Sequence, residues 1–255
     1  MGNQTLGRGE LWFSRFKPNT QVPEGFRLFG NCPEFNLTIE TEMLDHYSSM
    51  RGIREKDKSV PLETTRTGSF TCDDIQLDNL AYFFFGSKSK VTQTSATAQT
   101  ETFIGVVPGY SYQIGLSNLT PTGVKSLANV AVTVGGSAKA ANVDYLIDLE
   151  LGILTIVEGG TIASGATVTV TYDRGAKTFD QVISGTLPIE GTLRFISYNP
   201  EGPKLDYFFP YVKLSPNGDM SLIGDEWLTT PFNVEILNAT GKNAIYIDGR
   251  PYTAS

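Results

Sequence analysis

The sequence contains one histidine, His46, and two cysteines, Cys32 and Cys72, in 255 residues. A protein zinc site usually gathers several His or Cys ligands, so an ordinary zinc site is not expected. Two cysteines in a chain of this length do not make a disulfide framework, and we expect two reduced, semi-buried thiols. The sequence therefore predicts no metal site and no cofactor.

Long apolar runs are also missing. None approaches the ~20 residues that a transmembrane helix needs, and the segment that starts at Met1 lacks the basic and apolar regions of a signal peptide. The formal net charge is −7 and the pI is near 4.8. Sequence-independent binding to a phosphate backbone needs clustered Lys and Arg, so it is not expected. We expect no membrane insertion by this chain.

Catalytic signatures are scarce. His46 lies beside Asp45 and near Ser48, but a Ser–His–Asp site normally converges from distant positions, and no Gly-x-Ser-x-Gly elbow occurs. Asp225 and Glu226 are adjacent carboxylates, and a glycosidase needs only two. We predict that the protein is not an enzyme. A hydrolase that uses His46, Asp225 or Glu226 is the alternative from that class.

Strand patterns dominate what is present. Residues 35–43 alternate strictly, with apolar side chains on one face and Glu40 and Glu42 on the other, which indicates a half-buried strand. The charged stretch 45–61 predicts a long loop and 62–72 a second strand, so the three form a hairpin with a large tip. Similar patterns predict strands at 10–16, 191–198, 204–214 and 232–237, and Glu235 lies on a polar face of the last.

One helix is expected over residues 73–85. Asp73 is the candidate N-cap, with Gln76 as its capping-box partner. Gly86 occupies the position where a left-handed residue commonly ends a helix. The apolar stripe expected to pack on a sheet is Leu77, Leu80, Ala81 and Phe84.

The composition changes in the middle of the chain. Only seven of the 82 residues from 91 to 172 are charged, against 18% overall. Short strand patterns recur there between Gly-rich turns, which predicts a small sandwich or barrel. We predict a discontinuous β-framework over 1–87 and 179–255, with an inserted β-domain over 88–178.

Aromatic residues are scattered along the Gly- and Pro-rich first 33 residues. Two interpretations are open: they dock onto a neighbouring subunit, or they pack on the core of their own subunit. The residues are Trp12, Phe13, Phe16, Phe26 and Phe29.

Short motifs in both halves of the framework resemble the major tail tube proteins of long, flexible-tailed (siphovirus-type) bacteriophages. In the first half they are FNLTIETE from Phe35, DHYSS from Asp45, GIREKD from Gly52 and LA at Leu80. In the second half they are LRF from Leu193, NPEGP from Asn199, PYVKLSPNG from Pro210 and GDEW from Gly224. The resemblance covers roughly residues 30–86 and 185–240, and residues 88–178 match less well.

The resemblance implies a mainly β fold, a β-sandwich or barrel with one flanking α-helix. It implies rings, usually hexameric, that stack into a hollow tube through which the genome passes. Such tubes often carry an extra immunoglobulin-like domain, and the insert is interpreted as one. The subunit would belong to the virion tail and would be in the host cytoplasm during assembly.

The implied partners are further copies of the chain and the tape-measure, tail-tip (distal tail) and tail-terminator proteins. Double-stranded DNA would pass through the lumen without specific binding. We expect Glu40, Glu42 and Glu235 to face that lumen, because an acidic wall repels phosphates. The hairpin tip would contact the adjacent ring through Arg51, Arg54, Glu55, Lys56, Asp57 and Lys58.

Two further alternatives stay open. One is a carbohydrate- or receptor-binding β-module of a phage or cell-surface structure, with the insert as its binding face. Its candidate aromatic residues are Phe103, Tyr110, Tyr112 and Tyr145. The other is a related tube from a bacterial secretion system, which we would expect to lack so large an insert.

Overall fold

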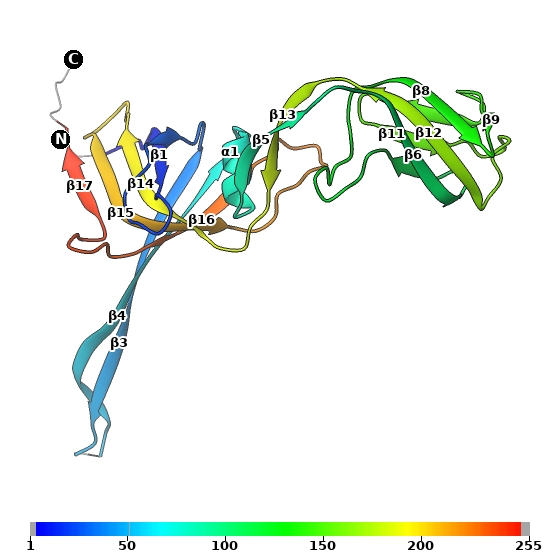
Figure 1. Ribbon diagram of the computed structural model, residues 1–255. Helices are drawn as coiled ribbons and strands as arrows, with labels where there is room; N and C mark the ends of the chain where they lie inside the picture. The colour runs from blue at the N-terminus through cyan, green and yellow to red at the C-terminus, as the bar shows by residue number, and fades with distance from the viewer. Residues whose placement is uncertain (1–3, 51, 251–255) are drawn as a thin grey trace. The chain divides into compact units, whose positions relative to one another are not determined.

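The computed structural model describes residues 4–50 and 52–250, and it is mainly β with several antiparallel sheets. The chain divides into two compact units. One, the framework unit, is formed by the chain up to Ser89 and from Val182 onward. The other, the insert unit, is Lys90–Gln181. Two paired strands, β5 (Ser87–Gln93) and β13 (Lys177–Ile183), carry the chain out of the framework unit and back (Figure 1).

The framework unit is built on one antiparallel sheet with the strand order β2-β1-β14-β15-β16-β4-β3, and β17 pairs with β15 beside this path. Its strands are β1 (Gly9–Arg15), β2 (Arg27–Leu28), β3 (Glu34–Ser48), β4 (Glu55–Cys72), β14 (Ile189–Ser197), β15 (Leu205–Pro216), β16 (Thr230–Ile236) and β17 (Tyr246–Gly249). Residues of β1 and β3, which are far apart in this order, line one groove, so the sheet is strongly curved.

Aromatic side chains fill the concave side of the sheet. The ring centroid of Phe29 lies 4.8 Å from that of Phe70 and 5.7 Å from that of Phe232. The ring centroids of Phe35 and Phe209 are 6.0 Å apart. Such tilted and edge-on pairs add to the stabilisation from burial. Of the aromatic residues near the N-terminus, Phe13, Phe16 and Phe29 are buried in this unit and Phe26 is exposed. Packing on the subunit's own core is therefore correct for those three.

The helix is shorter than expected and presents a different face. α1 spans Leu77–Phe83 with Gln76 at the N-cap and no side-chain cap, so the predicted cap at Asp73 is wrong. Its buried residues are Asn79, Ala81 and Phe83, whereas Leu77 and Phe84 are exposed. The predicted stripe is therefore wrong except for Ala81 and the partly buried Leu80.

The helix ends at Phe83, two residues earlier than predicted, and the left-handed residue after it lies one position earlier than predicted. Phe85, rather than Gly86, has the left-handed φ of 54°. The Phe85 amide donates to the Tyr82 carbonyl and the Gly86 amide to the Ala81 carbonyl, the bonding pattern of a Schellman end. Gly86 is required for another reason: a Cβ there would collide with the carbonyl oxygen of Ile183.

Cys32 and Cys72 form a disulfide, with Cα atoms 4.2 Å apart. The expectation of two reduced thiols is therefore wrong. Glu34 pairs with Thr71 in the β3–β4 register, and this register brings together two cysteines separated by 40 positions. The disulfide joins the chain at the base of the β3–β4 hairpin.

The insert unit contains two small sheets that share one core. The four-stranded sheet has the order β6-β12-β8-β9 and the three-stranded sheet the order β10-β11-β7. Valines of the first sheet, such as Val168, pack with Leu154 and Ile156 of the second. The strands are β6 (Ala96–Val106), β7 (Ser111–Gln113), β8 (Leu127–Val134), β9 (Ser137–Ala138), β10 (Tyr145–Asp148), β11 (Ile153–Ile156) and β12 (Ala166–Arg174).

Candidate functional site

The β3–β4 hairpin extends beyond the sheet that it belongs to. β3 pairs with β4 from Glu34–Thr71 to Ser48–Glu55, but β4 pairs with β16 only between Thr67 and Cys72. Past that point no other strand of the described chain lies beside the hairpin. Figure 1 shows its two strands leaving the framework unit together. The hairpin is thus the most prominent projection of this unit.

The projecting part exposes apolar side chains on both faces. Ile39 is 62% exposed and lies on the face that continues the concave side of the sheet, together with Met43. Leu44 and Val60 lie opposite each other on the other face, and both are exposed. At the turn, Met50 is 92% exposed. Period-two alternation is present as predicted, but in this subunit the apolar side chains beyond Phe35 have no core to enter.

The predicted loop at 45–61 is largely strand, which corrects that expectation. The charged side chains there form contacts along and across the two strands: Lys56 Nζ lies 2.7 Å from Asp45 Oδ1, and His46 Nδ1 lies 2.6 Å from Asp57 Oδ1. Hydrogen bonds from Lys56 and then Ser59 lower the pKa of Asp45 below its ordinary 3.8. Because these charged side chains pair with one another, the charged segment can continue as two antiparallel strands.

The residues predicted to contact an adjacent ring therefore lie at the far end of the hairpin. Glu55, Lys56, Asp57 and Lys58 begin β4, and Arg54 precedes it with its guanidinium 4.8 Å from the centroid of the Tyr47 ring. Arg51 lies outside the described residues. Their role in a ring contact stays a prediction.

The three predicted lumen residues share one face of the sheet. Glu235 pairs with Thr67 and Thr67 with Thr38, so Glu235 lies on the same face as Glu40 and Glu42. All three are exposed. Glu63, which the sequence pattern did not place on this face, lies directly opposite Glu42. Only the strand register shows this pair, because the position of Glu63 in a Thr-rich strand does not indicate which residue of β3 lies opposite it.

The outer edge of β3 is free. β3 is the last strand in the order, and no strand of the described residues pairs with its far side. An exposed strand edge of this length is a template for pairing with another chain. In many proteins a Pro or a short edge limits this hazard, but β3 spans 15 residues and contains no proline.

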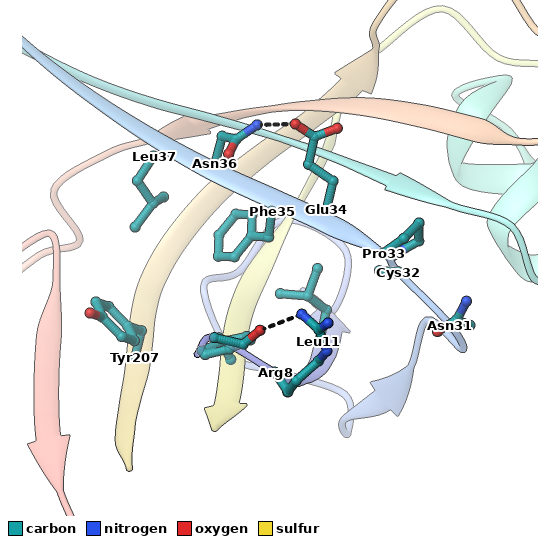
Figure 2. A pocket seen from close by; sticks show the side chains of 13 residues that line it. Arg8, Leu11, Asn31, Cys32, Pro33, Glu34, Phe35, Asn36, Leu37 and Tyr207 are labelled. Atoms are coloured by element: carbon teal, nitrogen blue, oxygen red, sulfur yellow. Dashed lines mark hydrogen bonds between the residues drawn. The ribbon is translucent and has the colours of Figure 1, made fainter. Parts of the chain in front are cut away.

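A groove of about 770 Å³ lies where the start of β3 faces the start of β1. Phe35, Leu11 and Tyr207 give it an apolar wall, as Figure 2 shows. Its charged residues are Arg8, whose Nη1 donates to the Gly7 carbonyl, and Glu34, which accepts from Asn36 Nδ2 at 2.6 Å. The groove therefore lies beside the free edge of β3, at the base of the hairpin.

The other candidate groups do not converge on one site. His46 contacts Asp57 rather than a serine, and Asp225 and Glu226 lie in an exposed loop. Within residues 4–50 and 52–250 no group of three or more His, Cys, Asp or Glu side chains is arranged to hold a metal ion. None of the helices that the structure describes is long and apolar enough to cross a membrane.

The aromatic residues considered for ligand binding in the insert do not form an exposed groove. Tyr145 is buried, and Phe103 and Tyr112 pack against the core with ring centroids 5.5 Å apart. The Tyr112 hydroxyl accepts a hydrogen bond from the Val107 amide. Tyr110 alone of the four is well exposed.

Fold and surface together define a class: a mainly β protein with an antiparallel framework, a projecting hairpin and an inserted β-unit. Within that class the chain belongs to the family described as "Protein of unknown function UCP028589", whose model matches residues 4–246. No curated protein matches the sequence.

Proposed function

We propose that this protein is the structural subunit of a phage tail tube and that it assembles into stacked rings around a hollow conduit for the genome. The observation that carries the proposal is the β3–β4 hairpin, which projects from the sheet with apolar side chains exposed on both faces. Exposing apolar side chains to water is unfavourable in free energy. Contact with a second copy of the chain would remove them from water.

Burial of the hairpin would supply part of the driving force for association. Fully burying a Leu, Ile or Met side chain stabilises by about 1.5–3 kcal/mol relative to leaving it exposed. Ile39 and Met43, on the face opposite Glu40 and Glu42, are both exposed in the single subunit. Complete burial of these two against a neighbour would therefore contribute at most about 3–6 kcal/mol, which offsets part of the entropic cost of association of about 4–15 kcal/mol.

Ring closure needs a heterologous contact, in which one surface of a subunit meets a different surface of the next. The free edge of β3 offers a row of unpaired backbone groups for such a contact. The groove beside the start of β1 is lined by the first residues of the same strand, so an edge-on neighbour would cover both. We propose six subunits per ring by resemblance to tail tube proteins.

The acidic face supports a conduit for DNA. Glu40, Glu42, Glu63 and Glu235 lie on one face, and Lys213, which pairs with Glu235 in the register, is also within 3.5 Å of Glu190. A wall with negative charge repels phosphates, so duplex DNA slides without sticking.

The protein acts without catalysis, and its other partners are tape-measure, tail-tip and tail-terminator proteins. The insert unit is an immunoglobulin-like decoration of the virion tail.

Negative-stain electron microscopy of the purified protein across a concentration series tests the proposal. Hollow tubes or stacked rings with a central channel are expected, alone or after addition of tail-tip and tape-measure partners. A pair of variants sharpens the test: Ile39→Thr in the hairpin should reduce assembly, whereas Ile104→Thr, at a still more exposed site in the insert unit, should not. Particles that stay monomeric under every condition, partners included, would exclude a tube subunit.

A further inference from the structure

A second exposed apolar surface lies in the framework unit, on the loop between β15 and β16. Ile223 is 95% and Trp227 92% exposed, and Leu222 is exposed beside them. The loop is attached at its base, because the Asn217 amide donates to the Pro231 carbonyl and Met220 packs against the core. Large apolar side chains held out in water on an anchored loop point to a protein partner.

The loop is also acidic. Between Pro216 and Thr230 it carries Asp219, Asp225 and Glu226 and no Lys or Arg. None of these carboxylates forms an ion pair with any residue that the structure describes. A partner for this loop would therefore combine apolar contacts with positive charge.

The hairpin turn has that chemistry. Met50 and Ile53 are among the most exposed apolar side chains of the framework unit. Arg54, Glu55 and Lys58 follow them in the chain, and none of these three forms an ion pair with any residue that the structure describes. The unpaired charge of the tip is therefore positive on balance. Lys56, in contrast, is already engaged by Asp45.

The two surfaces lie at opposite ends of the sheet. β3 runs from Glu34 in the sheet to Ser48 near the turn, and β16 runs in the same direction, because Thr230 pairs with Cys72 and Glu235 with Thr67. The loop precedes Thr230, so it leaves the sheet at the end away from the hairpin turn. In Figure 1 the chain between β15 and β16 extends away from the hairpin in agreement with this polarity.

We propose that the loop of residues 217–229 receives the hairpin turn of a second copy of this chain. Ile53 and Met50 of one copy would contact Ile223, Leu222 and Trp227 of the next, with Arg54 and Lys58 beside Asp225 and Glu226. Because donor and acceptor lie at opposite ends, the contact repeats from copy to copy without closing. This inference rests on the proposed tube and identifies the surface that joins one ring to the next.

Disulfide trapping tests the contact directly. The native cysteines are paired with each other, so an introduced cysteine has no native thiol to join. The variants Ile53→Cys and Ile223→Cys, each alone, should give little crosslinked product, and their mixture should give dimers on a non-reducing gel. The double variant should give a ladder of larger oligomers.

A matched control uses the same end of the sheet. Leu187 precedes β14, which runs parallel to β16, and it is exposed like Ile223. Leu187→Cys mixed with Ile53→Cys should not crosslink. Charge reversal gives a second measurement: Arg54→Glu should lower the yield of the Ile53–Ile223 crosslink about two- to fivefold, as for an exposed ion pair. Asp225→Arg in the partner should restore it.

The outcomes separate the contact from the conduit. Hollow tubes with no Ile53–Ile223 crosslink, or with equal crosslinking at Leu187, would overturn the contact and leave the tube. A ladder without hollow particles would support the contact and overturn the conduit. No crosslink at any concentration also overturns the contact.

Discussion

Glu42 lies directly opposite Glu63 on the β3–β4 hairpin, and both carboxylates are exposed. Like charges at directly opposed positions of an antiparallel pair are destabilising. Their presence on the face that also holds Glu40 and Glu235 is explained if this face must repel polyanions.

We predict that reversing this charge creates DNA binding. A variant with Glu40→Lys, Glu42→Lys and Glu235→Lys should retain duplex DNA at low salt, and the retention should weaken steeply as salt rises. Filter binding of assembled protein measures it. The control reverses Glu24, Glu150 and Glu158, which gives the same net charge on other surfaces. Equal retention by both variants would contradict a special role for the acidic face.

The Cys32–Cys72 disulfide should stabilise the framework unit. Closing a loop of this length constrains the unfolded chain, and loss of a native disulfide typically costs about 2–5 kcal/mol. Cys32→Ser with Cys72→Ser should lower the free energy of unfolding by about that amount. Both tryptophans, Trp12 and Trp227, lie in the framework unit, so their fluorescence in a urea titration measures this unit.

A control for the disulfide comes from the insert unit, which contains no cysteine. Amide NMR signals from Lys90–Gln181 should give the same midpoint of urea unfolding with and without reductant. If reductant does not change the urea concentration at which the framework unit unfolds, the disulfide does not contribute to its stability.

Asn79 should be a critical polar residue of the framework core. Its side chain is fully buried; Nδ2 donates to the Phe29 carbonyl at 2.8 Å, and Oδ1 accepts from Arg27 Nη2 at 2.6 Å. Asn79→Ala leaves the Phe29 carbonyl and the Arg27 guanidinium short of partners, so we expect a loss of about 2–3 kcal/mol. Urea unfolding measures it. Asn36→Ala, at an exposed site, should change stability by less than about 0.5 kcal/mol.

Asp144 should make the insert unit sensitive to acid. It accepts hydrogen bonds from the Ala140 amide at 2.9 Å and from the Thr161 amide and hydroxyl at 2.8 Å, which lower its pKa below the ordinary 3.8. The folded-state pKa is depressed, so the stabilisation is fully present above the unfolded-state value and is lost as the pH falls through the folded-state value.

The variant Asp144→Asn tests this sign. It should be less stable than the native protein at pH 7, and the difference should shrink as the pH falls below about 4. Amide NMR signals of residues 140–172, followed in urea titrations at each pH, measure it. Asp148→Asn, on the exposed surface of the same unit, is the control. A difference that stays constant with pH would show that the Asp144 carboxylate is not the titrating group.

Some of this fold follows from local pattern. Alternation in 35–43 and 232–237 depends on the period of the strand itself, so β3 and β16 could be predicted without any neighbour. The existence of a helix near Leu77–Phe83 was also predictable. Its buried face was not, because a helix of two turns takes its orientation from what it packs on. Arg27 and Phe29, some 50 positions earlier, bind Asn79 and so determine which side turns inward.

Strand continuation through 45–61 was missed for a related reason. Charged residues favour a loop when each strand is considered alone, but in the hairpin Asp45 meets Lys56 and His46 meets Asp57. The ladder and these ion pairs satisfy the polar groups together. Such pairing depends on which residues lie opposite each other, and a single strand carries no record of its register.

The sequence by itself determined the β class, the alternating strands and the weakly charged middle segment, because these depend on composition and on the period of each element. Tertiary structure alone decided that Cys32 meets Cys72, that Glu63 joins Glu42, and that the apolar residues of the hairpin lie exposed. Each of these follows from strand register and from where the sheet ends, and both are set by contacts between residues far apart in the chain.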